Sequence, residues 1–143
     1  VGYMSLKYTQ SNNVSLCYDG NLIGLYVDLN DLQENSFPTS ENQSFQLGLW
    51  SIKDKKIYDK HIHKDLSRNI QNTSEFLFVL QGKLTINVYS EDNKFVETIL
   101  LGPNESFLQF VGGHEIIAES ETKFFEIKQG PYLGKDADKS LVE

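Results

Sequence analysis

The chain of 143 residues has few cysteines, few arginines and no long apolar run, and each of these shortages excludes a class of protein. It has a single cysteine, Cys17, which has no partner for an intramolecular disulfide and fits a reducing compartment, so we expect a cytoplasmic protein. Its apolar runs are too short to cross a bilayer, and no basic and apolar leader opens the sequence. We therefore expect neither a membrane span nor export by that route.

Positive charge is also scarce. The chain has 13 basic and 20 acidic residues, a formal net charge of −7, and a single arginine, Arg68. This balance argues against a nucleic-acid or anionic-membrane surface. It also contains no glycine-rich phosphate loop, nucleophile elbow or CxxC motif, which excludes the common nucleotide-hydrolysing and serine or cysteine active sites. Val1, Gly2 and Tyr3 precede Met4, so a native N-terminus and an added segment both stay open.

What the sequence does contain is β-type patterning. Apolar and polar residues alternate over short segments that turn residues separate, and no long stretch has helical periodicity. This predicts one all-β domain, an antiparallel sandwich or barrel. Asp19-Gly20 predicts a hairpin turn, and residues 28–44 predict either a surface loop or a flap over the barrel mouth. The expected strands are 14–18, 22–27, 45–52, 57–63, 75–81, 83–89, 95–101, 107–111, 114–118 and 123–128.

The segment 75–81 is apolar on both faces. Leu77 and Val79 share one face with Glu75, whereas Phe76 and Phe78 share the other. Such a strand is buried on both sides. If the face of Glu75, Leu77 and Val79 lines the interior, the outer face with Phe76 and Phe78 must meet another sheet or another subunit, so we expect a homodimer.

All three histidines fall in one pattern. His61 and His63 are two residues apart, so on a strand both rings point to the same face. His114 follows Gly112-Gly113, a bend that can aim its ring inward. An ionised Glu75 on an interior face needs a partner, and a cation is the simplest one. The pattern predicts a metal site inside a small β-barrel.

These motifs resemble those of the cupin superfamily. The order is an HxH pair, a glutamate, six residues and a glycine, then a Gly-Pro turn and a later histidine, over about residues 45 to 130. The resemblance implies a double-stranded β-helix, or jelly-roll barrel, over 45–132, with strands and an acidic loop of 1–44 packed on it and a charged tail at 133–143. Eleven residues, 64–74, separate the HxH pair from the glutamate, more than is usual in the family, so a three-histidine site stays open. The implied metal ligands are His61, His63, Glu75 and His114.

The ligand set suits a divalent transition metal, Fe, Mn, Ni or Zn. The chain looks most like small cupins associated with surface-polysaccharide and sugar biosynthesis, which implies a small, oxygen-rich, sugar-derived ligand. We expect a metal-dependent isomerase or dioxygenase in which Arg68 contacts an anionic group of the substrate, although Arg68 can also be a solvated loop residue. The alternatives are a non-catalytic binding module with a structural or vestigial metal site, and a metal-independent isomerase.

Overall fold

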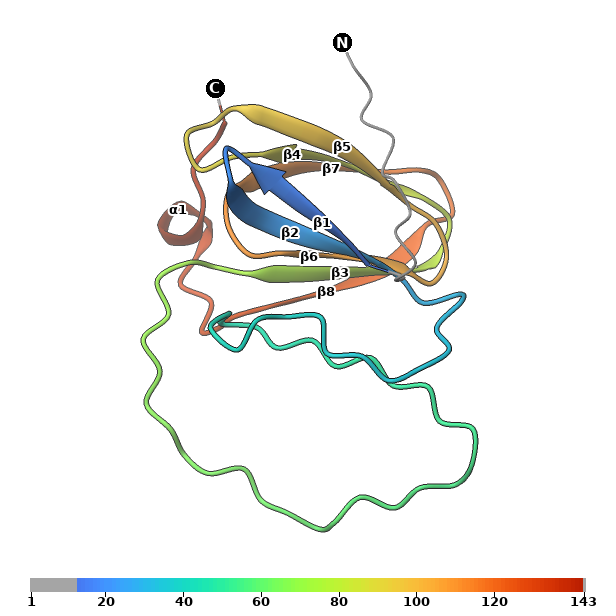
Figure 1. Ribbon diagram of the computed structural model, residues 1–143. Coiled ribbons are helices and arrows are strands. Elements are labelled where there is room, and N and C mark those ends of the chain that lie inside the picture. Colours follow the sequence, from blue (N-terminus) through green and yellow to red (C-terminus); the bar gives the residue numbers. More distant parts are fainter. Residues whose placement is uncertain (1–12, 143) are drawn as a thin grey trace.

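The computed structural model describes residues 13–142 and shows an all-β chain of two antiparallel sheets, as the alternation predicts (Figure 1). Val1 to Met4 lie outside the described residues. The elements are β1 (Asn13–Tyr18), β2 (Asn21–Asp28), β3 (Glu75–Gln81), β4 (Leu84–Tyr89), β5 (Phe95–Leu101), β6 (Glu105–Gln109), β7 (Gly113–Ala118), β8 (Lys123–Lys128) and the short helix α1 (Lys135–Asp138). No helix in residues 13–142 is long and apolar enough to cross a membrane.

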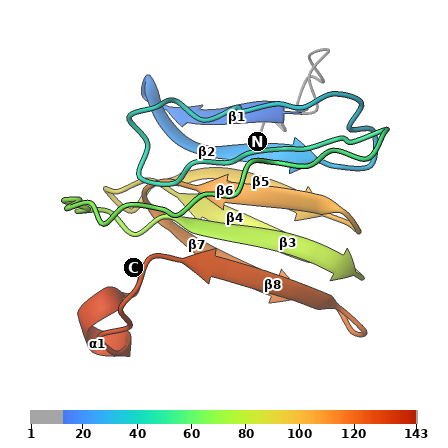
Figure 2. The same ribbon diagram turned by 90° about the horizontal axis from the view of Figure 1, so that it is seen from below.

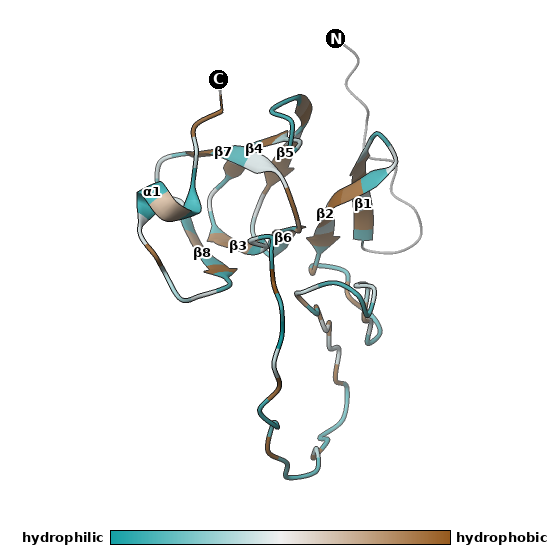
Figure 3. Cartoon of the chain, turned by 90° about the vertical axis from the view of Figure 1, so that its left-hand side faces the viewer, coloured by the Kyte–Doolittle hydropathy of each residue, from teal (hydrophilic) through white to brown (hydrophobic). Residues whose placement is uncertain are grey.

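The two sheets face each other but do not close into a barrel. One has the strand order β1-β2-β6-β3-β8 and the other β5-β4-β7. Figure 3 shows that β7 and β8 lie at the same side of this sandwich, opposite β1. Within the described residues, both strands pair on one side only, so the closed barrel expected from the sequence is corrected to a two-sheet sandwich with free edges.

The core fills the space between the sheets. It consists of the inward side chains of both sheets, with Leu77 and Val79 of β3 against Ile86 and Val88 of β4. Leu77 and Val79 are 1% and 0% exposed, which confirms the inner face assigned to this strand. Burial of these side chains is the main stabilising term, at ~1.5–3 kcal/mol for each large one.

Part of the outer face of the five-stranded sheet, over β2, β6 and Phe76, is covered by the same chain. Residues 29–49 cross it, as Figure 2 shows from below. Leu49 is buried there against Val27, Leu108 and Phe110, and Phe76 packs against this cluster. The acidic loop therefore lies over an apolar sheet face and not over the end of the sandwich. Phe76 therefore does not need a partner subunit to cover it. The homodimer stays a prediction.

Two predicted strands are wrong. Residues 45–52 form only one pair of backbone hydrogen bonds, between Leu49 and Ser36, and residues 57–63 form no strand and are exposed. Alternation produces a strand only where a neighbouring strand supplies hydrogen-bond partners and one face is buried. Residues 57–63 have the two-residue alternation of a strand, but in the described structure they have no neighbouring strand and no buried face.

The predicted turns are in place. Asp19 and Gly20 both have positive φ, 50° and 78°, and join β1 to β2 in the two-residue hairpin that their sequence favours. Gly112 has φ 85°, and a Cβ at this position would collide with the carbonyl oxygen of Tyr89. Only glycine therefore allows the close bend that starts β7.

Candidate functional site

A cluster of polar side chains lies between the two sheets at the start of β3. Glu75 is paired with Gln109 of β6 on one side and with Lys128 of β8 on the other, so these three side chains share the inward face. Glu126 is two residues from Lys128 and shares that face. His114 comes from the opposite sheet, where it is paired with the buried Val88. The topology thus brings residues from four strands to one point.

Gln109 fixes the orientation and protonation of His114. The Nε2 of Gln109 donates hydrogen bonds of 3.0 Å to the carbonyl oxygens of Val111 and Gly113. Its Oε1 is therefore an acceptor, and it lies 2.8 Å from Nδ1 of His114. The proton must sit on Nδ1, which leaves the lone pair on Nε2. This lone pair faces Glu75.

The contact between His114 and Glu75 is not an ion pair. Nε2 lies 3.4 Å from Oε2 of Glu75, beyond the usual range of roughly 2.7–3.2 Å for a hydrogen bond. Burial, and then a hydrogen bond and the negative charge of Glu126, raise the pKa of Glu75 to about 7. Burial, and then the positive charge of Lys139, lower the pKa of His114. Near neutral pH a partly protonated carboxyl therefore lies beside a neutral imidazole.

Glu75 and Glu126 share a proton. The hydrogen bond from Glu75 lowers the pKa of Glu126, so Glu75 holds the proton and Glu126 accepts it as a carboxylate. Lys128 and Lys139 partly offset the rise in the pKa of Glu75. The Glu75 side chain is only 14% exposed, whereas Glu126 is exposed, so solvent reaches the cluster from the β8 side.

The structure does not bring the other two predicted metal ligands to this cluster. His61 and His63 lie in residues 50–73, an irregular segment, called the arm below, that extends away from the sandwich (Figure 1). Their rings are exposed and 5.1 Å apart, and Nδ1 of His61 lies 2.8 Å from the carbonyl oxygen of Asp59. Arg68 is also exposed on the arm. Within residues 13–142 no three His, Cys, Asp or Glu side chains are grouped to hold a metal ion. In this arrangement the four predicted ligands do not fit one metal.

Sequence reasoning missed Gln109 and Glu126. Each lies two residues from another inward-facing residue of its strand: Gln109 from Phe107 on β6, and Glu126 from Lys128 on β8. Their proximity to Glu75 depends on which strands are neighbours in the sheet. Strand order was the missing information, because β6 and β8 are distant from β3 in the sequence.

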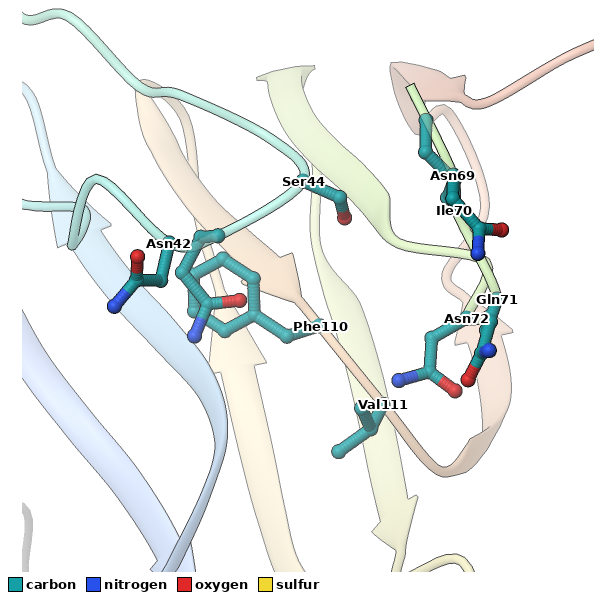
Figure 4. A pocket seen from close by; sticks show the side chains of 9 residues that line it. Asn42, Ser44, Asn69, Ile70, Gln71, Asn72, Phe110 and Val111 are labelled. Carbon is teal, nitrogen blue, oxygen red and sulfur yellow. The ribbon is translucent and has the colours of Figure 1, made fainter. Parts of the chain in front are cut away.

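A second feature is a polar hollow beside the start of β3 (Figure 4). Its volume is about 250 Å³. Phe110 and Val111 lie on one side, and amide side chains project from two loops. None of its lining side chains is charged, so it suits a neutral, hydroxyl-rich ligand better than an ion. The loop residues that line it are Asn42, Gln43, Ser44, Asn69, Ile70, Gln71 and Asn72.

No protein-family model matches the chain, and comparison with curated proteins and with solved structures found no significant match.

Proposed function

We propose that the chain is a double-stranded β-helix protein that binds a small, oxygen-rich, sugar-derived metabolite at the cluster of Glu75, Glu126 and His114, and that the imidazole and the carboxyl act on it as a base and an acid. The observation that carries this proposal is the lone pair on Nε2 of His114, which Gln109 holds toward Glu75. We place the protein in the cytosol, in keeping with its lone cysteine.

The fold assignment is supported by the strand order. Neighbouring strands in both sheets are antiparallel, and the pairs β3-β8, β3-β6 and β4-β7 join strands that are not consecutive in the chain, as the Greek keys of a jelly roll do. The inward cluster lies at one end of the sandwich, where small ligands commonly bind in such folds.

The arrangement suits isomerisation of a hydroxycarbonyl compound. Nε2 of His114 would remove a proton from the carbon next to the ligand's carbonyl group, and the carboxyl proton of Glu75 would pass to the carbonyl oxygen. The product of this half-reaction is an enediol. The carboxylate of Glu75 would then take the proton of the other enediol hydroxyl, and protonated His114 would give its proton to the former carbonyl carbon, which yields the isomeric carbonyl compound and restores both side chains. A carboxyl whose pKa is about 7 can give and take a proton near neutral pH.

A divalent transition metal, Fe, Mn, Ni or Zn, stays a proposed occupant. Glu75 and His114 supply a carboxylate oxygen and an imidazole nitrogen that such metals bind. The hydrogen bond from Nδ1 to Gln109 is the kind of outer contact that orients ligating histidines. His61 and His63 would have to move to complete the site, so no step above depends on a metal. Metal analysis of protein purified without added metal tests this occupant. The presence of one equivalent that His114→Ala removes would support it, and no affinity on reconstitution would exclude it.

Non-catalytic sugar binding is the second candidate, and the uncharged hollow in Figure 4 favours it. Amide groups and a neighbouring aromatic ring are suited to hydroxyl groups and to the apolar face of a sugar ring. In that case binding would depend on Asn72 and not on His114.

Proton exchange distinguishes the two candidates. The protein would be incubated in D₂O with a panel of aldoses, ketoses and hydroxy acids, and ¹H NMR would follow loss of the C–H signal next to the carbonyl. We expect exchange with at least one compound, reduced by about 10²-fold or more in His114→Gln. Glu115→Gln is the matched control, because Glu115 is next to His114 but exposed and bonded to Asn87. Binding without exchange, lost in Asn72→Ala, would favour the second candidate. Equal exchange in wild type and His114→Gln would contradict the first.

A further inference from the structure

The arm, residues 50–73, carries apolar side chains that nothing in its own copy covers. Ile57 and Ile62 are 81% and 92% exposed. Within the part of the chain that the structure describes, no hydrogen bond or ion pair joins residues 59–70 to either sheet. The arm still has the alternation of a strand over 57–63. A segment with β-type patterning and exposed apolar residues is suited to pairing with a free sheet edge.

The same chain has two free edges at one side of the sandwich. β7 and β8 are both edge strands and lie at the same side of the sandwich, one in each sheet, as Figure 3 shows. Their apolar side chains are also exposed: Ile117 at 45%, Phe125 at 41% and Ile127 at 53%. Val142 lies next to Gly113 at the start of β7, but no strand among residues 13–142 pairs with either edge. Long exposed edges of this kind are normally blocked or covered in stable proteins.

Charge makes the arm and the edges complementary. The arm holds six of the chain's 13 lysines and arginines but only three of its 20 acidic residues, so its formal net charge is +3 and that of the rest is −10. Residues 113–128, which include both edge strands, contain four glutamates and two lysines. A basic segment would therefore be attracted to this side of the sandwich.

Both ends of the arm are held on the five-stranded sheet, and the Ser74 end lies beside the end of β8, where its backbone N–H donates to the side chain of Gln129. Leu49 is buried on the outer face of the five-stranded sheet, and Ser74 is buried, with its hydroxyl donating to the carbonyl oxygen of Phe110. Between them the arm extends outward, and Figures 1 and 3 show it clear of β7 and β8. The two complementary features of the chain therefore do not meet within one copy.

We propose that the arm of one copy pairs with the free edges of β7 and β8 in a second copy, and that the second copy returns its arm in the same way. A two-fold exchange covers both exposed features at once, because each copy supplies one arm and one pair of edges. This interface differs from the one expected around Phe76 from the sequence, because residues of the segment 29–49 already pack against Phe76.

Sedimentation equilibrium of the full chain tests the association. We expect a dimer, and at least about a tenfold rise in its dissociation constant when Lys56 and Lys60 of the arm are both changed to glutamate. The matched control is Lys94→Glu with Lys135→Glu, which makes the same charge change at exposed lysines outside the arm and the edges. A monomeric wild type, or equal effects of the two double variants, would overturn the proposal.

Cross-linking tests the exchange itself. In a Cys17→Ser background, one chain would carry Ile62→Cys in the arm and another Ile117→Cys on β7, and a short bismaleimide would be added to their mixture. A covalent product that contains one of each chain is the expected result. A third chain that carries both cysteines tests the alternative, in which the arm pairs with the edges of its own copy. If it is linked only within itself, or if neither experiment gives a link, the arm does not pair with a second copy.

Discussion

Replacement of Glu75 by glutamine should stabilise the fold at high pH and leave it nearly unchanged at low pH. Because the folded-state pKa of Glu75 is raised from 4.5 to about 7, the folded protein binds this proton more tightly than the unfolded chain does. The associated stability is present below pH 4.5 and is lost as the pH rises through 7. At ~1.4 kcal/mol per pKa unit the full loss is about 3 kcal/mol. Solvent that enters beside the exposed Glu126 reduces it, so we expect ~1–3 kcal/mol.

Glutamine keeps the hydrogen bond to Glu126 but carries no charge at any pH. Urea unfolding followed by circular dichroism, at about pH 5 and about pH 8.5, would measure the difference in unfolding free energy between Glu75→Gln and wild type. The pKa of His114 is lowered, so its titration adds stability as the pH rises. Because both proteins contain His114, this contribution largely cancels in the difference between their unfolding free energies. Glu119→Gln, at an exposed carboxyl, is the control. A Glu75→Gln protein that is no more stable than wild type at the higher pH would refute the reasoning.

Two further predictions concern the scaffold that holds the site. Leu101→Ala should lower the unfolding free energy by ~2–5 kcal/mol, whereas Leu100→Ala should cost less than about 1 kcal/mol, because these neighbours on β5 are 0% and 52% exposed; similar losses in denaturant titrations would mean that the sheets do not pack as described. Gly112→Ala should cost more than about 1 kcal/mol, since its positive φ and the carbonyl of Tyr89 leave no room for a Cβ, and an unchanged melting temperature would contradict the bend.

Sequence patterns predicted turns and the faces of strands better than they predicted which strands pair. The hairpin at Asp19-Gly20 and the inner face of 75–81 follow from local preferences and from the period of two, and both are confirmed. The strand predicted at 57–63 has the same period but lacks a neighbour in the structure. A period shows which side chains share a face, but pairing depends on chain segments that the pattern does not identify.

In the candidate site, too, the residues found from sequence patterns differ from those that depend on strand pairing. Glu75 and His114 were predicted to converge, and their side chains do meet between the sheets. Gln109 and Glu126 were not predicted. Alternation places both on inward faces, but their roles depend on the strand order that puts β6 and β8 on either side of β3. The chemistry of the site depends on these two residues: one orients the imidazole and the other shares the carboxyl proton.

The central claim is that His114 presents an unprotonated Nε2 to Glu75 between the sheets. Long-range ¹H–¹⁵N correlation NMR on ¹⁵N-labelled protein tests it directly, with the signal of His114 assigned by His114→Gln. At neutral pH we expect a neutral ring with its proton on Nδ1, held by Gln109, and a free Nε2. A ring protonated on Nε2, or on both nitrogens, would contradict the account.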